Sequence, residues 1–125
     1  MSTPTKSRSW YARSVSQLIA LYNVPDNYDN QGSRKPCRRG IRDALVVLDC
    51  AKAQDCEVKH VSNGCDGEVS VQFWNDNKEA EIDCMADGKA AWIDLPDSPD
   101  DFWDVERSTL PSAVARIKAA LEEPR

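Results

Sequence analysis

The chain has 125 residues, of which 41% are hydrophobic and 30% are charged, and this balance excludes a disordered protein. No apolar run approaches the roughly 20 residues that a membrane helix needs, and Met1 to Arg8 lack the apolar core of a signal peptide, so we expect a cytoplasmic protein without membrane contact. Charge is uneven: residues 1–42 carry eight Lys or Arg and two Asp, whereas residues 43–125 carry eight basic and 19 acidic residues. The resulting charges of +6 and −11 give the formal −5 and favour a face shaped for a charged partner.

The N-terminal region predicts one amphipathic helix. Residues 1–7 are rich in Ser, Thr and Lys and are expected to form a flexible N-terminus, which leaves residues 8–125 as a single domain. Over residues 8–22 the apolar positions recur at i, i+4, i+7, i+8 and i+11. This spacing predicts a helix with one buried face, which Pro25 ends.

A basic cluster opens the second predicted helix. Residues 24–35 are crowded with Asp, Asn and Gly and predict an ordered loop, and residues 36–53 predict a helix with Pro36 in its first turn. The cluster comprises Arg34, Lys35, Arg38, Arg39 and Arg42. Cations at a helix N-terminus oppose the helix dipole, so another interaction must favour them there. They either pair with the acidic sheet of the same molecule or of a second copy in a homodimer, or bind nucleic acid; the acidic total favours the first interpretation.

The apolar period then changes from 3.6 to 2, which predicts four short strands joined by turns rich in Asn, Asp and Gly. They are expected at residues 56–61, 69–73, 79–84 and 90–95. Residues 94–104 predict an acidic, proline-broken loop, and residues 111–122 a final helix with Thr109 as its N-cap. The order predicts an α+β fold: two N-terminal helices, a four-stranded antiparallel β-meander and a C-terminal helix, with the helices on one face of the sheet.

No catalytic, metal-binding or cofactor-binding motif accompanies these elements. The only histidine, His60, lies in a predicted strand without a nucleophile motif. The aspartates of residues 94–104 lack the spacing of a calcium loop, and no glycine-rich phosphate loop follows a strand. The five cysteines (Cys37, Cys50, Cys56, Cys65 and Cys84) form no C-x-x-C pair and are expected to be reduced. We therefore predict a protein that is not an enzyme and carries no metal or cofactor.

The acidic residues predict a protein-binding surface. The alternation in residues 79–84 places Glu79, Glu81 and Asp83 on the outer face of a strand, and the loop that follows adds Asp97, Asp100, Asp101 and Trp103. An aromatic anchor within a charged rim is typical of protein–protein hot spots. The alternative is that Phe102 and Trp103 pack beneath the sheet as part of the core.

Part of the chain resembles a loosely defined group of small bacterial and phage proteins. The segment Asn23-Val24-Pro25-Asp26-Asn27-Tyr28-Asp29-Asn30-Gln31-Gly32-Ser33, followed by a helix and by Asp66-Gly67-Glu68-Val69 and Asp87-Gly88, is similar to their L-P-x-x-W-D-G-x-G-A-x-x-P loop, helix and hairpin strands. The match spans about residues 18–93, with Tyr28, Asn30 and Ser33 in place of the Trp, the first Gly and the Ala. The resemblance implies the architecture and no activity.

These patterns together predict a small acidic module that binds and inhibits a partner protein with a basic surface. By analogy of composition, an anti-defence inhibitor of the anti-CRISPR kind or an antitoxin, in the cytosol of a bacterium or of a phage-infected host, is the specific form expected. The alternative is a nucleic-acid-binding or regulatory module that uses the basic cluster.

Overall fold

The computed structural model describes residues 3–94 and 101–122, with side chains from residue 9 onward. Three helices and five strands follow one another along the described chain, with two short 3-10 turns between them. In chain order the elements are α1 (Thr3–Ala20), η1 (Leu21–Asn23), α2 (Arg38–Ala53), β1 (His60–Asn63), β2 (Val69–Asn75), β3 (Lys78–Met85), β4 (Gly88–Asp94), β5 (Asp101–Val105), η2 (Arg107–Thr109) and α3 (Leu110–Glu122). The predicted α+β class is confirmed.

The sheet is an antiparallel meander in which the order in space, β1-β2-β3-β4-β5, is the order along the chain. The prediction of four strands is wrong, because β5 overlaps the segment predicted as an acidic loop and pairs with β4. Aspartate and proline disfavour strands, which concealed β5 in the sequence. Pairing with β4 supplies the backbone hydrogen bonds that the local sequence does not predict.

Other boundaries differ by a few residues. The first helix begins at Thr3 and not at residue 8. The first strand begins at His60 and not at residue 56, although Val58 is fully buried ahead of it. The second helix begins at Arg38, so Pro36 precedes its first turn.

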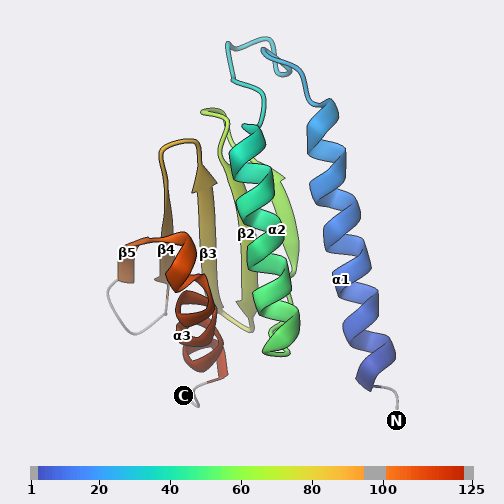
Figure 1. Cartoon of the computed structure of the whole chain (residues 1–125), viewed down its shortest axis with the longest axis vertical. Helices are drawn as coiled ribbons and strands as arrows, with labels where there is room; N and C mark the ends of the chain where they lie inside the picture. Colours follow the sequence, from blue (N-terminus) through green and yellow to red (C-terminus); the bar gives the residue numbers. More distant parts are fainter. Residues whose placement is uncertain (1–2, 95–100, 123–125) are drawn as a thin grey trace.

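Figure 1 shows the helices in one layer over the sheet, with α2 between α1 and α3. Alternate strand residues face this layer and are buried, as in β3, where Ala80, Ile82 and Cys84 alternate with more exposed neighbours. Helices on one face of the sheet, as predicted, are confirmed for the described residues. The largest fully buried side chains of the core include Phe73, Leu48, Ile82, Leu110 and Ile117.

The start of α2 lies very close to the sheet. A Cβ built on Gly40 would come within 2.7 Å of both the Cys84 carbonyl oxygen and Cys37 Sγ, so this contact requires a residue without a side chain. The N-cap is Cys37, whose Sγ accepts a hydrogen bond from Gly40 N at 3.2 Å. The first turns of α2 are thereby fixed against β3.

Helix α1 covers the β1 edge of the sheet. Gln17 Oε1 accepts a hydrogen bond from Val61 N at 3.0 Å, and Arg13 Nη2 donates one to Val58 O at 2.7 Å. Side chains thus satisfy backbone groups that an edge strand otherwise presents to other chains. No helix in the described part of the chain is long and apolar enough to cross a membrane.

Candidate functional site

The face of the sheet opposite the helices is the strongest candidate site, and we call it the outer face. The strand register fixes which side chains share it, because residues paired across strands point to the same side. Its members are His60 and Ser62 of β1, Ser70, Gln72 and Trp74 of β2, Glu79, Glu81, Asp83 and Met85 of β3, Ala90, Trp92 and Asp94 of β4, and Phe102 and Asp104 of β5. Figure 1 shows all the helices on the other side of the sheet.

Carboxylates and aromatic rings share neighbouring positions on this face. One row crosses the sheet through the register pairs Gln72–Glu81, Glu81–Trp92 and Trp92–Phe102. Phe102 is 66% exposed, and Trp74 at the end of β2 is 42% exposed. Exposed apolar rings beside charged groups are characteristic of binding surfaces rather than of ordinary solvated sheets.

The two central carboxylates are held by neighbouring polar side chains. Gln72 Nε2 donates a hydrogen bond to Glu81 Oε1 at 3.1 Å, and Ser70 Oγ donates one to Asp83 Oδ1 at 2.7 Å. Both donors come from β2 and both acceptors from β3, at paired register positions. The carboxylates are therefore oriented before any partner binds, which reduces the entropy lost on binding.

Asp83 also titrates in an unusual range. Burial raises the pKa of Asp83 to about 7, with further increases from the hydrogen bond to Glu81 and from the charges of Glu81 and Glu68, while the Ser70 hydrogen bond acts in the opposite direction. Near neutral pH, Asp83 is consequently protonated for part of the time. A cation brought close to Asp83 would favour its ionised form.

The structure separates the acidic residues that the sequence grouped together. Glu79, Glu81 and Asp83 share the outer face as predicted, whereas Asp101 and Trp103 lie on the helix side of β5. Asp101 forms an ion pair with Arg116 of α3, and the Arg116 guanidinium lies 3.9 Å from the centre of the Trp103 ring. Trp103 packs against the core, so the prediction of an exposed anchor at Trp103 is not supported. Phe102, its neighbour in β5, points outward instead.

Two predicted residues, Asp97 and Asp100, lie outside the described residues. The outer face gains acidic members that the sequence prediction did not include, Asp94 and Asp104. Asp94 alternates with Ile93 at the end of a predicted strand, which was the available signal for it. Asp104 alternates with Trp103 in the same way, but that signal required recognising β5 as a strand.

The basic cluster lies at the start of α2, and all five of its side chains are exposed. Among the described residues only Arg39 of this cluster forms an ion pair, with Asp43 one turn further along the same helix. Pairing of the cluster with the acidic sheet of the same molecule is therefore not observed among the described residues. Pairing with the sheet of a second copy, the other form of the interpretation that the sequence favoured, stays a prediction. The other cationic side chains of the cluster face solvent.

A buried ion pair under this cluster was missed from the sequence. Asp43 is 3% exposed, and its Oδ2 lies 3.0 Å from Nζ of Lys89, which is also buried. The contact is an ion pair by distance rather than an aligned hydrogen bond, because Oδ2 has no hydrogen-bond partner. A charged residue within the apolar stripe of residues 40–51 and a lysine at an inward position of β4 were the available signals.

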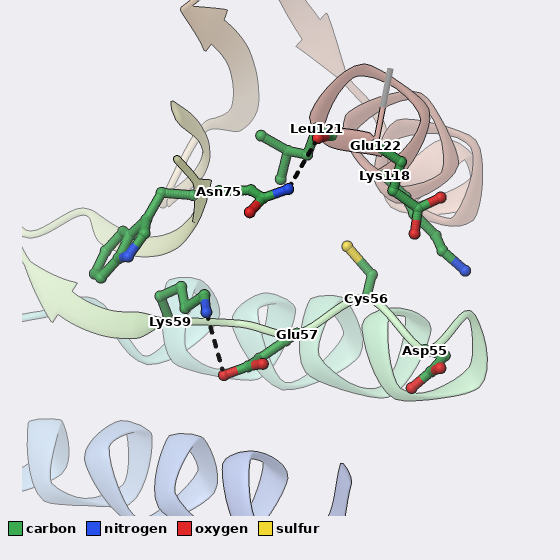
Figure 2. Close-up of a pocket in the computed structure, with 9 residues that line it drawn as sticks. Asp55, Cys56, Glu57, Lys59, Asn75, Lys118, Leu121 and Glu122 are labelled. Carbon is green, nitrogen blue, oxygen red and sulfur yellow. Dashed lines mark hydrogen bonds and ion pairs between the residues drawn. The ribbon is translucent and has the colours of Figure 1, made fainter. Parts of the chain in front are cut away.

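A hollow of about 220 Å³ opens between the segment before β1, the end of β2 and α3. Figure 2 shows the sulfur of Cys56 facing this space, with Lys59 paired to Glu57 at 3.5 Å and Asn75 Nδ2 donating to Leu121 O at 3.2 Å. Burial raises the pKa of the Cys56 thiol to about 11. The thiol is protonated at neutral pH, which makes it a poor nucleophile.

The other cysteines and His60 complete the set of candidate nucleophiles and metal ligands that the sequence analysis considered. All five cysteines are free thiols, and burial raises the pKa of Cys84 to about 12. His60 is exposed on β1. Within residues 3–94 and 101–122, no group of three or more His, Cys, Asp or Glu side chains is placed to hold a metal ion.

No family model matches the chain, and neither a curated protein nor a solved structure is significantly similar to it. The resemblance of residues 18–93 to small bacterial and phage proteins therefore stays a prediction. The outer face is the surface of this molecule on which positioned carboxylates and exposed aromatic rings coincide.

Proposed function

We propose that this chain is a non-catalytic binding protein whose outer face docks on a basic surface of a partner protein. The observation that carries the proposal is the row formed by Glu81, Trp92 and Phe102 on a sheet face that no described helix covers. A sheet is a rigid platform, so its side chains keep their spacing when a partner approaches.

The chemistry of the face favours a partner rich in arginine or lysine. Carboxylates attract such a partner at long range and accept charge-assisted hydrogen bonds from it at contact. Aromatic rings bury apolar area and also accept cations against their faces. Asp83 supports the same choice, because a nearby guanidinium would favour its ionised form.

Inhibition is the form of this function that we propose in particular. Basic protein surfaces often bind nucleic acids through their cations, and an acidic protein that covers such a surface blocks that contact. An anti-defence inhibitor or an antitoxin would act in this way. This specific role rests on composition and on the charge of the outer face.

The test uses capture of partners from a host lysate, identification by mass spectrometry and affinity measurement with the purified partner. The face variant combines Glu79→Gln, Glu81→Gln and Asp104→Asn, and a second variant carries Phe102→Ala. We expect each to weaken binding about tenfold or more, since a lost hot spot or several lost charges change the binding free energy by about 1.4 kcal/mol or more.

A matched control removes the same number of carboxylates away from the face, by Asp76→Asn, Asp87→Asn and Glu122→Gln. These residues lie in the two hairpin turns beside β3 and on α3. The control is expected to bind like the unmodified chain. Equal losses in the face variant and the control would reduce the effect to net charge, and unchanged binding in the face and Phe102→Ala variants would refute the proposal.

A further inference from the structure

A second surface, distinct from the outer face, gathers positive charge at the start of α2. It contains the basic cluster and one arginine from η2, and we call it the basic end: Arg34, Lys35, Arg38, Arg39, Arg42 and Arg107. Figure 1 shows the segment before α2 and the first turns of α2 together at one end of the molecule. This surface plays no part in the function proposed above.

Arg39 and Arg107 converge from elements far apart in the sequence. Arg39 Nε lies 3.9 Å from Asp43 Oδ2, and Arg107 Nε lies 4.0 Å from Asp43 Oδ1. The same carboxylate already has Lys89 at 3.0 Å, so three cations surround one buried anion. The side chains of Arg39 and Arg107 are 71% and 67% exposed, so most of their N–H groups face solvent.

The helix itself adds positive potential at this point. The first turn of α2 contains no acidic residue, and its N-cap is Cys37. The first-turn N–H groups and the dipole of α2 therefore act in the same direction as Arg38, Arg39 and Arg42. Such an arrangement is unfavourable in isolation and becomes favourable when an anion binds.

The segment that carries Arg34 and Lys35 is fixed in place. Arg34 N donates to Cys65 O at 2.8 Å, and Cys37 N donates to Gly67 O at 2.9 Å. The nearby loop aspartate Asp26 accepts a hydrogen bond from Lys35 N at 3.0 Å, so it is turned to the backbone rather than to the arginine side chains. The cations are consequently presented from a rigid frame.

We infer that the basic end binds the phosphate backbone of a nucleic acid. Several separate cations from three segments match the repeated phosphates of a chain better than they match one phosphate group. Arginine forms paired hydrogen bonds with phosphate oxygens, and five of the six residues are arginines. Tyr28, 39% exposed in the preceding loop, is available to stack on an unpaired base.

The experiment measures fluorescence anisotropy of labelled single-stranded and duplex DNA and RNA of about 20 nucleotides, titrated with the full chain at about 50 to 200 mM KCl. The variants are Arg34→Gln with Lys35→Gln, Arg38→Gln with Arg42→Gln, and Arg107→Gln. The control pair, Lys52→Gln with Lys59→Gln, removes two positive charges near the opposite end of α2. Circular dichroism confirms that each variant is folded.

We expect salt-dependent binding that weakens about 3- to 10-fold in each double variant and stays unchanged in the control. The slope of log Kd against log salt should fall by about 0.7 for each phosphate of a single strand that the variant no longer neutralises, and by about 0.9 for each phosphate of a duplex. Binding that is absent at the lowest salt concentration, or equally weakened in the control, would overturn the inference.

Two further measurements distinguish nucleic acid from other partners that the basic end could bind. Binding to anionic lipid vesicles without binding to nucleic acid would overturn the inference in favour of a membrane surface. Self-association at low salt that the basic-end variants abolish, again without nucleic-acid binding, would overturn it in favour of a second copy of the chain. Loss of nucleic-acid binding leaves the function proposed for the outer face untouched, because the two sets of variants share no residue.

Discussion

Replacing Asp83 with asparagine tests whether the outer face contains a carboxyl group with a raised pKa. Asparagine has the shape of the neutral acid and keeps an oxygen for the Ser70 hydroxyl, which donates to Asp83 at 2.7 Å. The substitution therefore removes the titration and leaves the packing in place. Its effect on stability should depend on pH.

The direction in which stability changes with pH follows from the direction of the pKa change. Burial and the neighbouring Glu81 raise the pKa of Asp83 from 3.8 to about 7 in the folded chain. Between these values the folded state holds a proton that the unfolded state has released. The contribution of Asp83 to stability is thus complete below about pH 4 and is lost as the pH rises to about 7.

The pKa difference corresponds to about 4 kcal/mol as an upper limit, at about 1.36 kcal/mol for each pKa unit. Asp83 is partly exposed, so solvent screening reduces its contribution to the free energy of unfolding to about 1–2 kcal/mol. About 1 kcal/mol of this contribution is lost between about pH 5 and pH 8. Relative to the unmodified chain, Asp83→Asn should therefore become more stable by about 1 kcal/mol when the pH is raised from about 5 to 8.

The assay is urea unfolding of both proteins at these two pH values, together with an NMR titration of the Asp83 carboxyl carbon. Glu79→Gln, at an exposed position on the same strand, serves as the control and should show no such change with pH. Glu81→Gln should move the Asp83 titration to lower pH, because it removes the neighbouring charge. A carboxyl carbon that titrates near the ordinary aspartate pKa of about 4, or a stability difference that is the same at both pH values, would refute the reasoning.

Three further substitutions test the packing that supports both surfaces, each by urea unfolding. Gly40→Ala should destabilise the chain by about 1–3 kcal/mol despite the better helix propensity of alanine, because its Cβ would meet a β3 carbonyl oxygen at 2.7 Å; a more stable variant would contradict this close contact. Asp43→Leu should lower the free energy of unfolding by about 3–5 kcal/mol, because it leaves the buried Lys89 unpaired. Adding Lys89→Met should restore most of the lost stability, and a double variant that is no more stable than Asp43→Leu would argue against the pair. Arg116→Gln should cost less than about 1 kcal/mol but shift the indole NMR signal of Trp103, and an unmoved signal would exclude their stacking.

The features that the sequence predicts correctly are local ones. Helical and strand periodicity predicted the helices, the meander from 69 to 94 and the outward alternation of Glu79, Glu81 and Asp83. These features depend on the spacing of apolar residues within a single element, so they need no knowledge of the element's neighbours. The helices were therefore predicted to within a few residues, and Glu79, Glu81 and Asp83 were predicted on the correct face.

Tertiary structure decided the rest, because the missing information lies in contacts between distant segments. Strand β5 forms by pairing with β4. The register of that pairing places Phe102 on the outer face and Trp103 against Arg116. Asp43 is stabilised by Lys89, a residue from a distant strand, and the same carboxylate brings Arg107 to the basic end. The sequence alone determined that opposite charges are segregated along this chain. Only the fold decided which carboxylates share a face with aromatic rings, since a strand's partners fix the direction of its side chains.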